Sequence, residues 1–365
     1  MPTTRAVVHY GLCGLAYSSY VLQGLEELAD EGEIELIIKR SVPADLQAVT
    51  AGHPHMQMTP LFEATEGSTR VRFCVDNHDK ADFIHPGLIA NIDHYFKLNH
   101  DPEQLDQLDL TVAERAKIKP FRGPISPVGL SPIRHRPALK VVPAVAWGAR
   151  DIVRRYRQLR KLLPLTDITA LRSEAKSHDV NFVNRIYREP HHKPINDFRY
   201  EVGHRLATHP DINAKVGFIG PGVTGKFERY AVEETAPRDH LQQLAASRVG
   251  IYVWGTHRCL SFKLCELLAL GLPVVGQTIP QDRNNLATLP NLSEQFAFDD
   301  PQELVDAVAK ALTDEARLVE LARSNIELFD HTLAPRPSAR RIINTVFGEA
   351  SSGSLPRPNS EEHHS

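Results

Sequence analysis

The stretch SFKLCELLALGLPVV, Ser261 to Val275, has the pattern of a short helix followed by a glycine stop, a proline and a buried strand. Ser261 stands in the N-cap position, where a serine oxygen accepts a backbone N–H bond from the first turn. Gly271 is well placed for the left-handed C′ position, and Pro273 prevents the helix from continuing. The sequence therefore predicts a short helix with both ends fixed.

Three polar residues interrupt the first turns of this otherwise apolar helix: Ser261, Lys263 and Glu266. The buried run VGIYVWG comes just before, so the helix begins at the carboxyl end of an expected strand, where open α/β sheets bind ligands. The free N–H groups and dipole of a helix N-terminus attract anions such as phosphate. Lys263 opposes that dipole, which argues for a bound anion.

The carboxylate of Glu266 accepts hydrogen bonds and suits two neighbouring hydroxyls, such as those of a ribose. With the anion-binding helix start, it indicates a site for a nucleotide diphosphate. The alternative is a surface ion pair between Lys263 and Glu266, which adds little to stability.

The rest of the chain alternates between strand-like and helix-like runs on either side of a proline-rich middle, Lys119 to Pro143. Before it, RAVVHYG, IELIIKR and VRFCVDNH are expected strands, and AYSSYVLQGLEELADEG is an expected helix. After it, DVNFVNR, AKVGFIG and RVGIYVWG are expected strands. Strands separated by helices imply parallel sheets covered on both faces. We therefore predict an α/β fold with two facing Rossmann-like domains and a cleft between them.

The expected boundaries follow these changes in pattern. They are an N-terminal domain over 1–140, a basic helical linker over 141–177, a C-terminal domain over 178–314, helices over 315–348 and a disordered tail over 349–365. The basic helix within the linker, 150–161, could lie on an anionic membrane surface, but a solvated or interdomain helix is the simpler interpretation.

Composition narrows the function classes. The formal net charge of −3 gives no reason to expect nucleic acid as a partner. The sequence has no apolar run long enough for a membrane span and no signal-peptide pattern, so a cytoplasmic location is expected. The four cysteines lack C-x-x-C spacing, and the histidine pairs HPH and HH lack carboxylate partners at helical spacing, so we expect reduced thiols and no metal site.

The pattern S-x-K-x-x-E-L-L-A-L-G-x-P-V-V, preceded by LQQLAASRVGIYVWG, resembles the donor-site segment of GT-B fold glycosyltransferases, of the group 1 or exostosin-like type. The match is specific over Asp239 to Gly276 and consistent in element order over Ala6 to Phe347. The resemblance implies two facing Rossmann-like domains and a C-terminal helical segment that returns to the first domain. It also implies a nucleotide-sugar co-substrate and no metal or other cofactor.

The resemblance implies a role for each matching residue. Ser261 and Lys263 would contact the diphosphate, and Glu266 would bind the ribose of the nucleotide sugar. A basic residue after the first strand of the second domain commonly reaches the same diphosphate, which points to Arg185. The glycine-rich turn after the first strand of the chain borders donor and acceptor, which makes Gly11 and Gly14 candidates.

One position departs from the pattern. Many retaining members carry another glutamate eight positions before the one that corresponds to Glu266, and this chain has Arg258 there. The stereochemical outcome stays open, and an inverting mechanism would need a base from the first domain.

The best candidates for that base lie in CVDNHDKAD, at the end of a predicted strand. Asp76, His78 and Asp79 would project from there into the cleft, with a histidine oriented by an aspartate as the base. A polar strand-to-loop turn would explain the same letters. Lys97 is a weaker candidate, since it can be a snorkelling lysine at a strand end.

The sequence thus favours a glycosyltransferase that moves a sugar from a nucleotide-sugar donor to a glycan, lipid or other hydroxyl acceptor. A polysaccharide or lipid acceptor would be compatible with peripheral membrane contact through 150–161. The alternatives are a catalytically silent GT-B-like subunit, a nucleotide-sugar epimerase or phosphorylase, and a dehydrogenase. The last is only weakly indicated, because GLCGLA lacks the G-x-G-x-x-G order.

Overall fold

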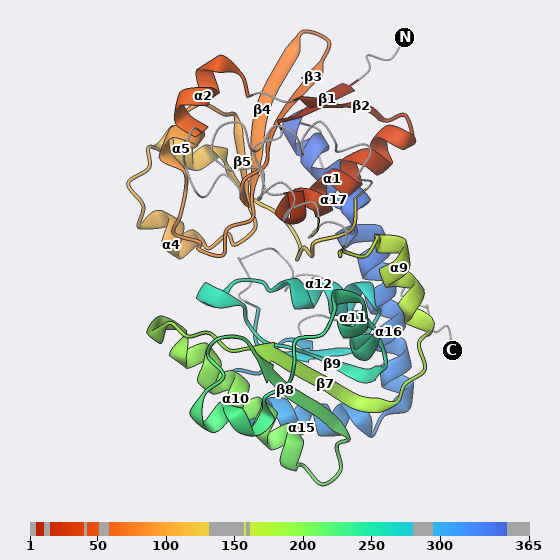
Figure 1. Ribbon diagram of the computed structural model, residues 1–365. Coiled ribbons are helices and arrows are strands. Elements are labelled where there is room, and N and C mark those ends of the chain that lie inside the picture. Colours follow the sequence, from red (N-terminus) through yellow and green to blue (C-terminus); the bar gives the residue numbers. More distant parts are fainter. Residues whose placement is uncertain are drawn as a thin grey trace, which may run out of the picture.

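The computed structural model describes residues 5–10, 15–39, 42–50, 58–130, 157, 161–279 and 295–348. Figure 1 shows two α/β domains stacked one above the other, and the C-terminal helices run along one side of both. The predicted class, α/β with two Rossmann-like domains and a C-terminal helical segment, is confirmed by the two sheets and their helices. The expected domain boundaries stay predictions.

The N-terminal domain is built on a six-stranded sheet with the order β2-β1-β3-β4-β5-β6. Its strands are β1 (Arg5–Tyr10), β2 (Ile34–Lys39), β3 (Leu61–Glu66), β4 (Thr69–Asp76), β5 (His94–Lys97) and β6 (Ile118–Pro120). β1 pairs in parallel with β2, and β4, β5 and β6 run parallel to one another.

β3 runs antiparallel to both of its neighbours, so the prediction of a parallel sheet is wrong for this domain. β3 and β4 form a hairpin through the two-residue loop of Gly67 and Ser68, and Gly67 has a φ of +60°. A two-residue loop with a glycine in its first position is typical of a tight hairpin. The run LFEATE that forms β3 is absent from the strands expected from the sequence.

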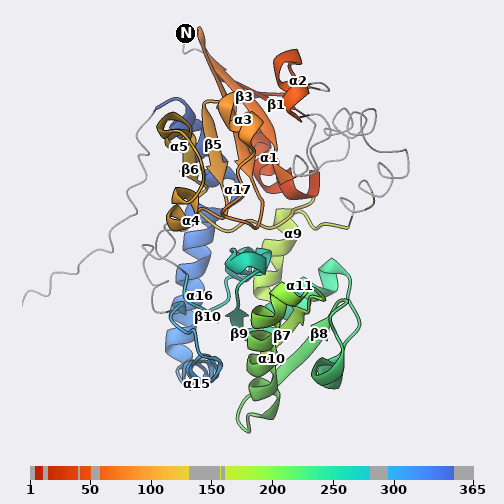
Figure 2. The same ribbon diagram turned by 90° about the vertical axis from the view of Figure 1, so that its left-hand side faces the viewer.

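Helices cover both faces of this sheet, as Figures 1 and 2 show. The helices of the domain are α1 (Leu15–Asp30), α2 (Ala44–Thr50), α3 (Pro86–Ala90), α4 (Pro102–Asp106) and α5 (Val112–Lys117). α1 contributes Leu22 and Leu25 to the core on one face, whereas Leu46 of α2 and Leu88 of α3 belong to a separate apolar cluster.

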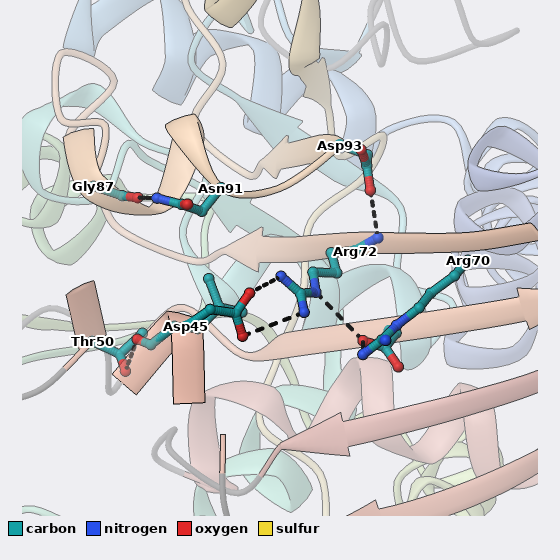
Figure 3. A network of polar contacts seen from close by, with 9 residues as sticks. Asp45, Thr50, Arg70, Arg72, Gly87, Asn91 and Asp93 are labelled. Carbon is teal, nitrogen blue, oxygen red and sulfur yellow. Dashed lines mark hydrogen bonds and ion pairs between the residues drawn. The ribbon is translucent and has the colours of Figure 1, made fainter. Parts of the chain in front are cut away.

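A polar network holds the β3–β4 hairpin to its surroundings (Figure 3). The guanidinium of Arg72 contacts Asp45 at 2.5 Å and Glu63 at 3.4 Å, and its backbone N–H donates to Asp93. Glu63 also accepts from Arg70. Each of these guanidinium groups therefore has a carboxylate partner.

The C-terminal domain has a four-stranded, fully parallel sheet with the order β10-β9-β7-β8. Its strands are β7 (His178–Arg185), β8 (Ala214–Ile219), β9 (Ser247–Tyr252) and β10 (Val274–Gly276). The chain goes from β7 outward to β8 and then crosses to β9 on the other side of β7. The topological switch point, where such sheets bind ligands, therefore lies between the carboxyl ends of β7 and β9.

The longer helices of this part are α10 (Lys193–Thr208), α11 (Pro237–Ala245), α12 (Phe262–Ala269) and α15 (Pro301–Leu312). The short helix α9 (Leu165–Ala170) precedes β7. Short 3₁₀ turns cover Leu171–Ser173, Pro190–His192, Gly225–Tyr230 and Thr256–Arg258. Pro301 follows the side-chain cap of Asp300 at the start of α15, as expected for a helix N-terminus.

The C-terminal segment returns to the first domain. α16 (Glu315–Leu328) leads through a π-helical turn, η7 (Phe329–Leu333), into α17 (Pro335–Val346), which packs on α1 (Figures 1 and 2). A Cβ atom on Gly24 of α1 would lie 2.1 Å from the carbonyl oxygen of Pro335, so only glycine allows this approach. The buried hydroxyl of Tyr20 donates to the carbonyl of Leu333 at 2.6 Å.

Within the described ranges, no helix combines the length and the apolar character needed to cross a membrane. Of the predicted basic helix 150–161, only Arg157 and Lys161 lie among the described residues, and both are exposed. The expected tail, 349–365, lies outside them.

Candidate functional site

The predicted helix after β9 is α12, and its C-terminal end forms as expected. Gly271 has a φ of +67°, and its N–H donates to Leu268 while that of Leu272 donates to Leu267. These two bonds are the Schellman pattern that satisfies the last carbonyls of a helix. α12 therefore ends at a fixed point.

The N-terminal end of α12 differs from the expectation in one respect. Ser261 occupies the N-cap position with extended backbone angles, but its side chain makes no capping hydrogen bond. Its Oγ is buried and has no hydrogen-bond partner among the residues that the structure describes. A buried hydroxyl without a partner is costly in a native protein, so it marks a place where a ligand can supply one.

Lys263 lies in the first turn of α12 and reaches the switch point of the sheet. Its Nζ donates to the carbonyl oxygen of Val183, near the carboxyl end of β7, at 2.5 Å. Burial lowers the pKa of Lys263 to about 8, an effect that Glu266 opposes and Arg199 reinforces. The alternative of a surface ion pair with Glu266 is not realised, since the described residues include no such contact within 4.0 Å.

Glu266 lies one turn further along α12 and contacts both domains. Its Oε1 accepts a hydrogen bond at 3.1 Å from the hydroxyl of Ser126, which belongs to the N-terminal half of the chain. Its Oε2 lies 4.0 Å from Nε2 of His240 on α11. Burial raises the pKa of Glu266, whereas Lys263 and the bond from Ser126 lower it. The carboxylate therefore lies at the junction of the two domains, and its Oε2 has only a distant contact of 4.0 Å with His240 among the described residues.

His240 is neutral in this arrangement. Burial, with a contribution from the charge of Lys263, lowers the pKa of His240 to about 4. At neutral pH its contact with Glu266 is therefore not an ion pair. Because the imidazole is uncharged, Lys263 is the cation that lowers the pKa of Glu266.

Two arginines mark the carboxyl end of β7. Arg185, predicted to reach the diphosphate, pairs with Glu234 at 2.7 Å, and both side chains are exposed. Arg199 of α10 is buried, and its guanidinium donates to the carbonyl oxygens of Arg185 and Trp254 at 2.6 and 2.8 Å. Arg199 thus ties the ends of β7 and β9 together at the switch point.

The predicted catalytic residue Asp76 does not project into an open cleft, so that expectation is wrong. Its side chain is fully buried and forms an ion pair of 2.9 Å with Lys97, which is also fully buried. Asp76 further accepts from the hydroxyl of Tyr95 and from the backbone N–H of His78. The physical reason is that a carboxylate withdrawn from water needs a counter-charge and hydrogen bonds, which Lys97 and Tyr95 supply inside the first domain.

Asp79 lies at the interdomain boundary, next to His78 in the chain. Asp79 accepts a hydrogen bond at 2.5 Å from the hydroxyl of Thr256, in the loop before α12. The ring of His78 packs on Phe83, and its Nδ1 accepts from the backbone N–H of Lys80. Asp79 therefore contacts the loop that leads to Ser261 in the chain, whereas these contacts of His78 stay within its own turn.

Arg258, which occupies the place of a second glutamate, lies on the ring of Trp254 with a distance of 4.2 Å to the centroid. Its φ of +58° and that of +54° at His257 are unusual for residues other than glycine. The ring of His257 lies 5.7 Å from those of both His191 and His192. The loop before α12 is thus a strained segment lined by flat side chains.

Across the described ranges, no group of three or more histidine, cysteine or acidic side chains is arranged to hold a metal ion. Cys74, Cys259 and Cys265 are free and buried, as expected for reduced thiols. Gly11 and Gly14 lie outside the described residues, and their predicted role stays a prediction.

The structure brings Ser261, Lys263 and Glu266 together with three residues that the sequence reasoning missed: Ser126, His240 and Arg199. His240 could have been noticed as a polar residue near the start of a helix that ends just before β9. Ser126 lies in a proline-rich loop, and nothing in its local sequence indicates a contact with Glu266. Arg199 is one basic residue among many on a helix.

No protein-family model matches the chain. No curated protein matches it either. The solved structures that are similar to it in fold include the following two. One is the T4 phage β-glucosyltransferase BGT in complex with its UDP-glucose substrate, with 10% identity, 71% of this chain and 83% of the other covered, and a TM-score of 0.32. The other is the DNA modifying enzyme β-glucosyltransferase, with 10% identity, 91% and 93% covered, and a TM-score of 0.39.

Proposed function

We propose that the protein is a glycosyltransferase that takes a sugar from a nucleotide-sugar donor, bound at the start of α12. The observation that carries the proposal is the pairing of two unsatisfied groups at one helix start. Among the described residues, the buried Oγ of Ser261 has no partner, and the ammonium of Lys263 bonds to one carbonyl alone. A diphosphate would supply oxygens to both.

Each residue has a distinct part in this proposal. Ser261 and Lys263 bind the diphosphate together with the free N–H groups of α12, whose dipole also favours an anion. Glu266 accepts hydrogen bonds from the ribose hydroxyls, which replace the hydroxyl of Ser126 on its Oε1. Arg199 positions the strand ends around the ligand and does not itself contact it. Arg185 would have to leave Glu234 to reach the diphosphate.

The acceptor would be a glycan, a lipid or another hydroxyl compound, activated by a base from the first domain. His78 and Asp79 are the candidates. Since Nδ1 of His78 accepts a backbone N–H, the proton of the neutral ring sits on Nε2, and the ring presents a donor. A base must present a lone pair, so Asp79 fits the role better once Thr256 releases it, and Asp76 holds the backbone of this turn.

Calorimetry with a panel of nucleoside diphosphates tests the donor site. We expect one of them to bind, and Lys263→Ala and Glu266→Ala to weaken that binding about tenfold or more, as for the loss of a hydrogen bond to a charged group. Lys310→Gln is the matched control, because Lys310 is exposed at the end of α15. If no nucleoside diphosphate binds, or if the control weakens binding equally, the donor site is disproved.

Turnover of the corresponding nucleotide sugar tests the reaction. We expect slow donor hydrolysis without acceptor, lost in Asp79→Asn while nucleotide binding survives. A second candidate, a silent nucleotide-binding subunit, is favoured by the hydroxyls of Ser126 and Thr256, which already occupy Glu266 and Asp79. Binding without turnover across broad donor and acceptor panels would favour it, and conversion of the sugar without transfer would favour an epimerase.

A further inference from the structure

A cavity of about 130 Å³ lies between β6 and α17, apart from the residues of the candidate donor site. One wall is apolar and includes Phe96, and the hydroxyl-bearing residues Ser338 and Thr345 line the α17 side. Its charged lining residues are Lys119, Arg122 and Arg341. A cavity of roughly 150 Å³ holds a benzene molecule, so this one has room for a small polyatomic group.

The charges around this cavity all have the same sign. Of the described residues that line it, none is acidic. Neither Lys119 nor Arg122 forms an ion pair within the described part of the chain. Within the described part of the chain, the side chain of Arg341 bonds to neutral groups only. It donates to the carbonyls of Thr332 and Arg122 and to the hydroxyl of Ser338.

The neighbouring arginines of α17 show the contrast. Arg336 and Arg340 lie on the outer side of the helix and pair with Glu31 and Glu33, just after α1. Arg341, one residue further, is more enclosed and contacts no carboxylate in the described ranges. Burial lowers the pKa of Arg341 to about 10, and the charge of Arg122 contributes. The charged form of Arg341 is therefore less stable here than it would be in water.

We propose that this cavity binds a phosphate group, free or as a monoester. Three cations on one small cavity can donate to the oxygens of a tetrahedral oxyanion. The hydroxyls of Ser338 and Thr345 already donate to the carbonyls of Leu333 and Arg341. The apolar wall with Phe96 would accept the first atoms of an ester group. This site does not depend on the proposed donor site, since the two share no residue.

A phosphate bound here would connect two parts of the chain that are far apart in sequence. Lys119 and Arg122 belong to the segment that leads to Ser126, and Arg341 belongs to the helix that returns from the C-terminal domain. Arg341 already holds both sides through the carbonyls of Arg122 and Thr332. Since the ligand binds the folded protein, it stabilises the folded state by mass action.

Thermal unfolding of the full chain in inorganic phosphate, with sodium chloride at matched ionic strength as reference, tests the proposal. We expect phosphate to raise the unfolding temperature of the wild type and of Lys263→Ala, whose donor site is impaired. In the double variant Lys119→Gln/Arg122→Gln, phosphate affinity measured by calorimetry falls about tenfold or more. Arg122→Lys keeps the charge and retains binding, and Lys310→Gln removes a remote charge and changes nothing.

Two further probes identify the source of the phosphate. Glycerol 3-phosphate represents a small ester, and phosphatidylcholine vesicles containing phosphatidic acid represent a lipid headgroup. Binding of any of the three probes that the double variant loses supports the site and names its ligand. If the wild type binds none of them, or if the double variant binds as tightly as the wild type, the proposal is wrong. Loss of nucleotide binding in Lys263→Ala with phosphate stabilisation intact separates the two sites.

Discussion

Arg72 of the N-terminal sheet reaches two carboxylates (Figure 3), whereas Lys263 at the start of α12 reaches one carbonyl oxygen among the described residues. The same contrast holds in the core of the first domain, where Asp76 and Lys97 pair in complete burial. Ser261 in the second domain is left with a buried oxygen that has no partner in the described structure.

The difference separates charges whose partners the fold supplies from groups left with few partners, which we propose bind a ligand. Withdrawing a polar group from water costs free energy unless a partner replaces the lost hydrogen bonds. In the N-terminal sheet the protein supplies those partners itself. At the start of α12 it does not, and the pKa of Lys263 is lowered as a result. Shifted groups beside unsatisfied polar atoms are typical of functional sites.

The largest loss of stability is expected when the buried ion pair of the first domain is broken. Asp76→Ala leaves the ammonium of Lys97 buried without its counter-charge, which costs about 3 to 5 kcal/mol of unfolding free energy. Urea unfolding measures this. In the double variant Asp76→Ala/Lys97→Met most of the loss should be recovered, because no charge remains buried. A single variant as stable as the wild type would contradict the structural role of the pair.

Lys263→Met should show the opposite behaviour. Because burial already disfavours the ammonium, removing it should cost no more than about 1 kcal/mol of unfolding free energy. Nucleoside diphosphate affinity should nevertheless fall about tenfold to a hundredfold, as for loss of a charge-assisted hydrogen bond. Urea unfolding and calorimetry on the same preparation measure both quantities. A strong loss of stability with unchanged affinity would make Lys263 a structural residue.

The lowered pKa of Lys263 gives a pH dependence of binding. Only the ammonium form attracts the diphosphate, so affinity should fall as the pH rises through about 8, by up to about tenfold per pH unit. Binding near pH 8 should take up a proton, which calorimetry in buffers of different ionisation enthalpy detects. Lys263→Met should abolish the uptake, and equal uptake in the variant would assign the proton to another group.

The same shift has a defined sign for stability. Since the pKa of Lys263 is lower in the folded state than its ordinary value of 10.5, the unfolded chain binds more protons between about pH 8 and that value. The contribution of Lys263 to folding therefore becomes more favourable as the pH rises through this window. The contribution is least favourable below pH 8, because the folded protein there holds the buried side chain as an ammonium.

The smallest loss of stability is expected at the partly exposed Arg72, in the polar network of the β3–β4 hairpin. Arg72→Met leaves Glu63 paired with Arg70, so the unfolding temperature should fall by less than about 3 °C. Nucleotide affinity should stay unchanged, because the hairpin does not contribute to the α12 site. Thermal unfolding and calorimetry check both. A change in affinity would show that the two regions are coupled.

Local sequence was sufficient for α12 and for much of the C-terminal domain. Gly271 and Pro273 set the end of the helix, and the alternation of strands and helices predicted the parallel sheet. The antiparallel β3 was missed, although the short run LFEATE is followed closely by Gly67, a turn signal. Asp76 was expected in the cleft, because a sequence shows the end of a strand but not the lysine that pairs with it.

By itself, the sequence determined where α12 begins and ends and which polar residues stand in its first turns, because these depend on capping and on contacts a few residues apart. Only the tertiary structure decided what surrounds them. Ser126 meets Glu266 across 140 residues, and Thr256 meets Asp79 across 177. The common physical reason is distance along the chain: the packing of two domains brings these groups together, and no local pattern encodes it.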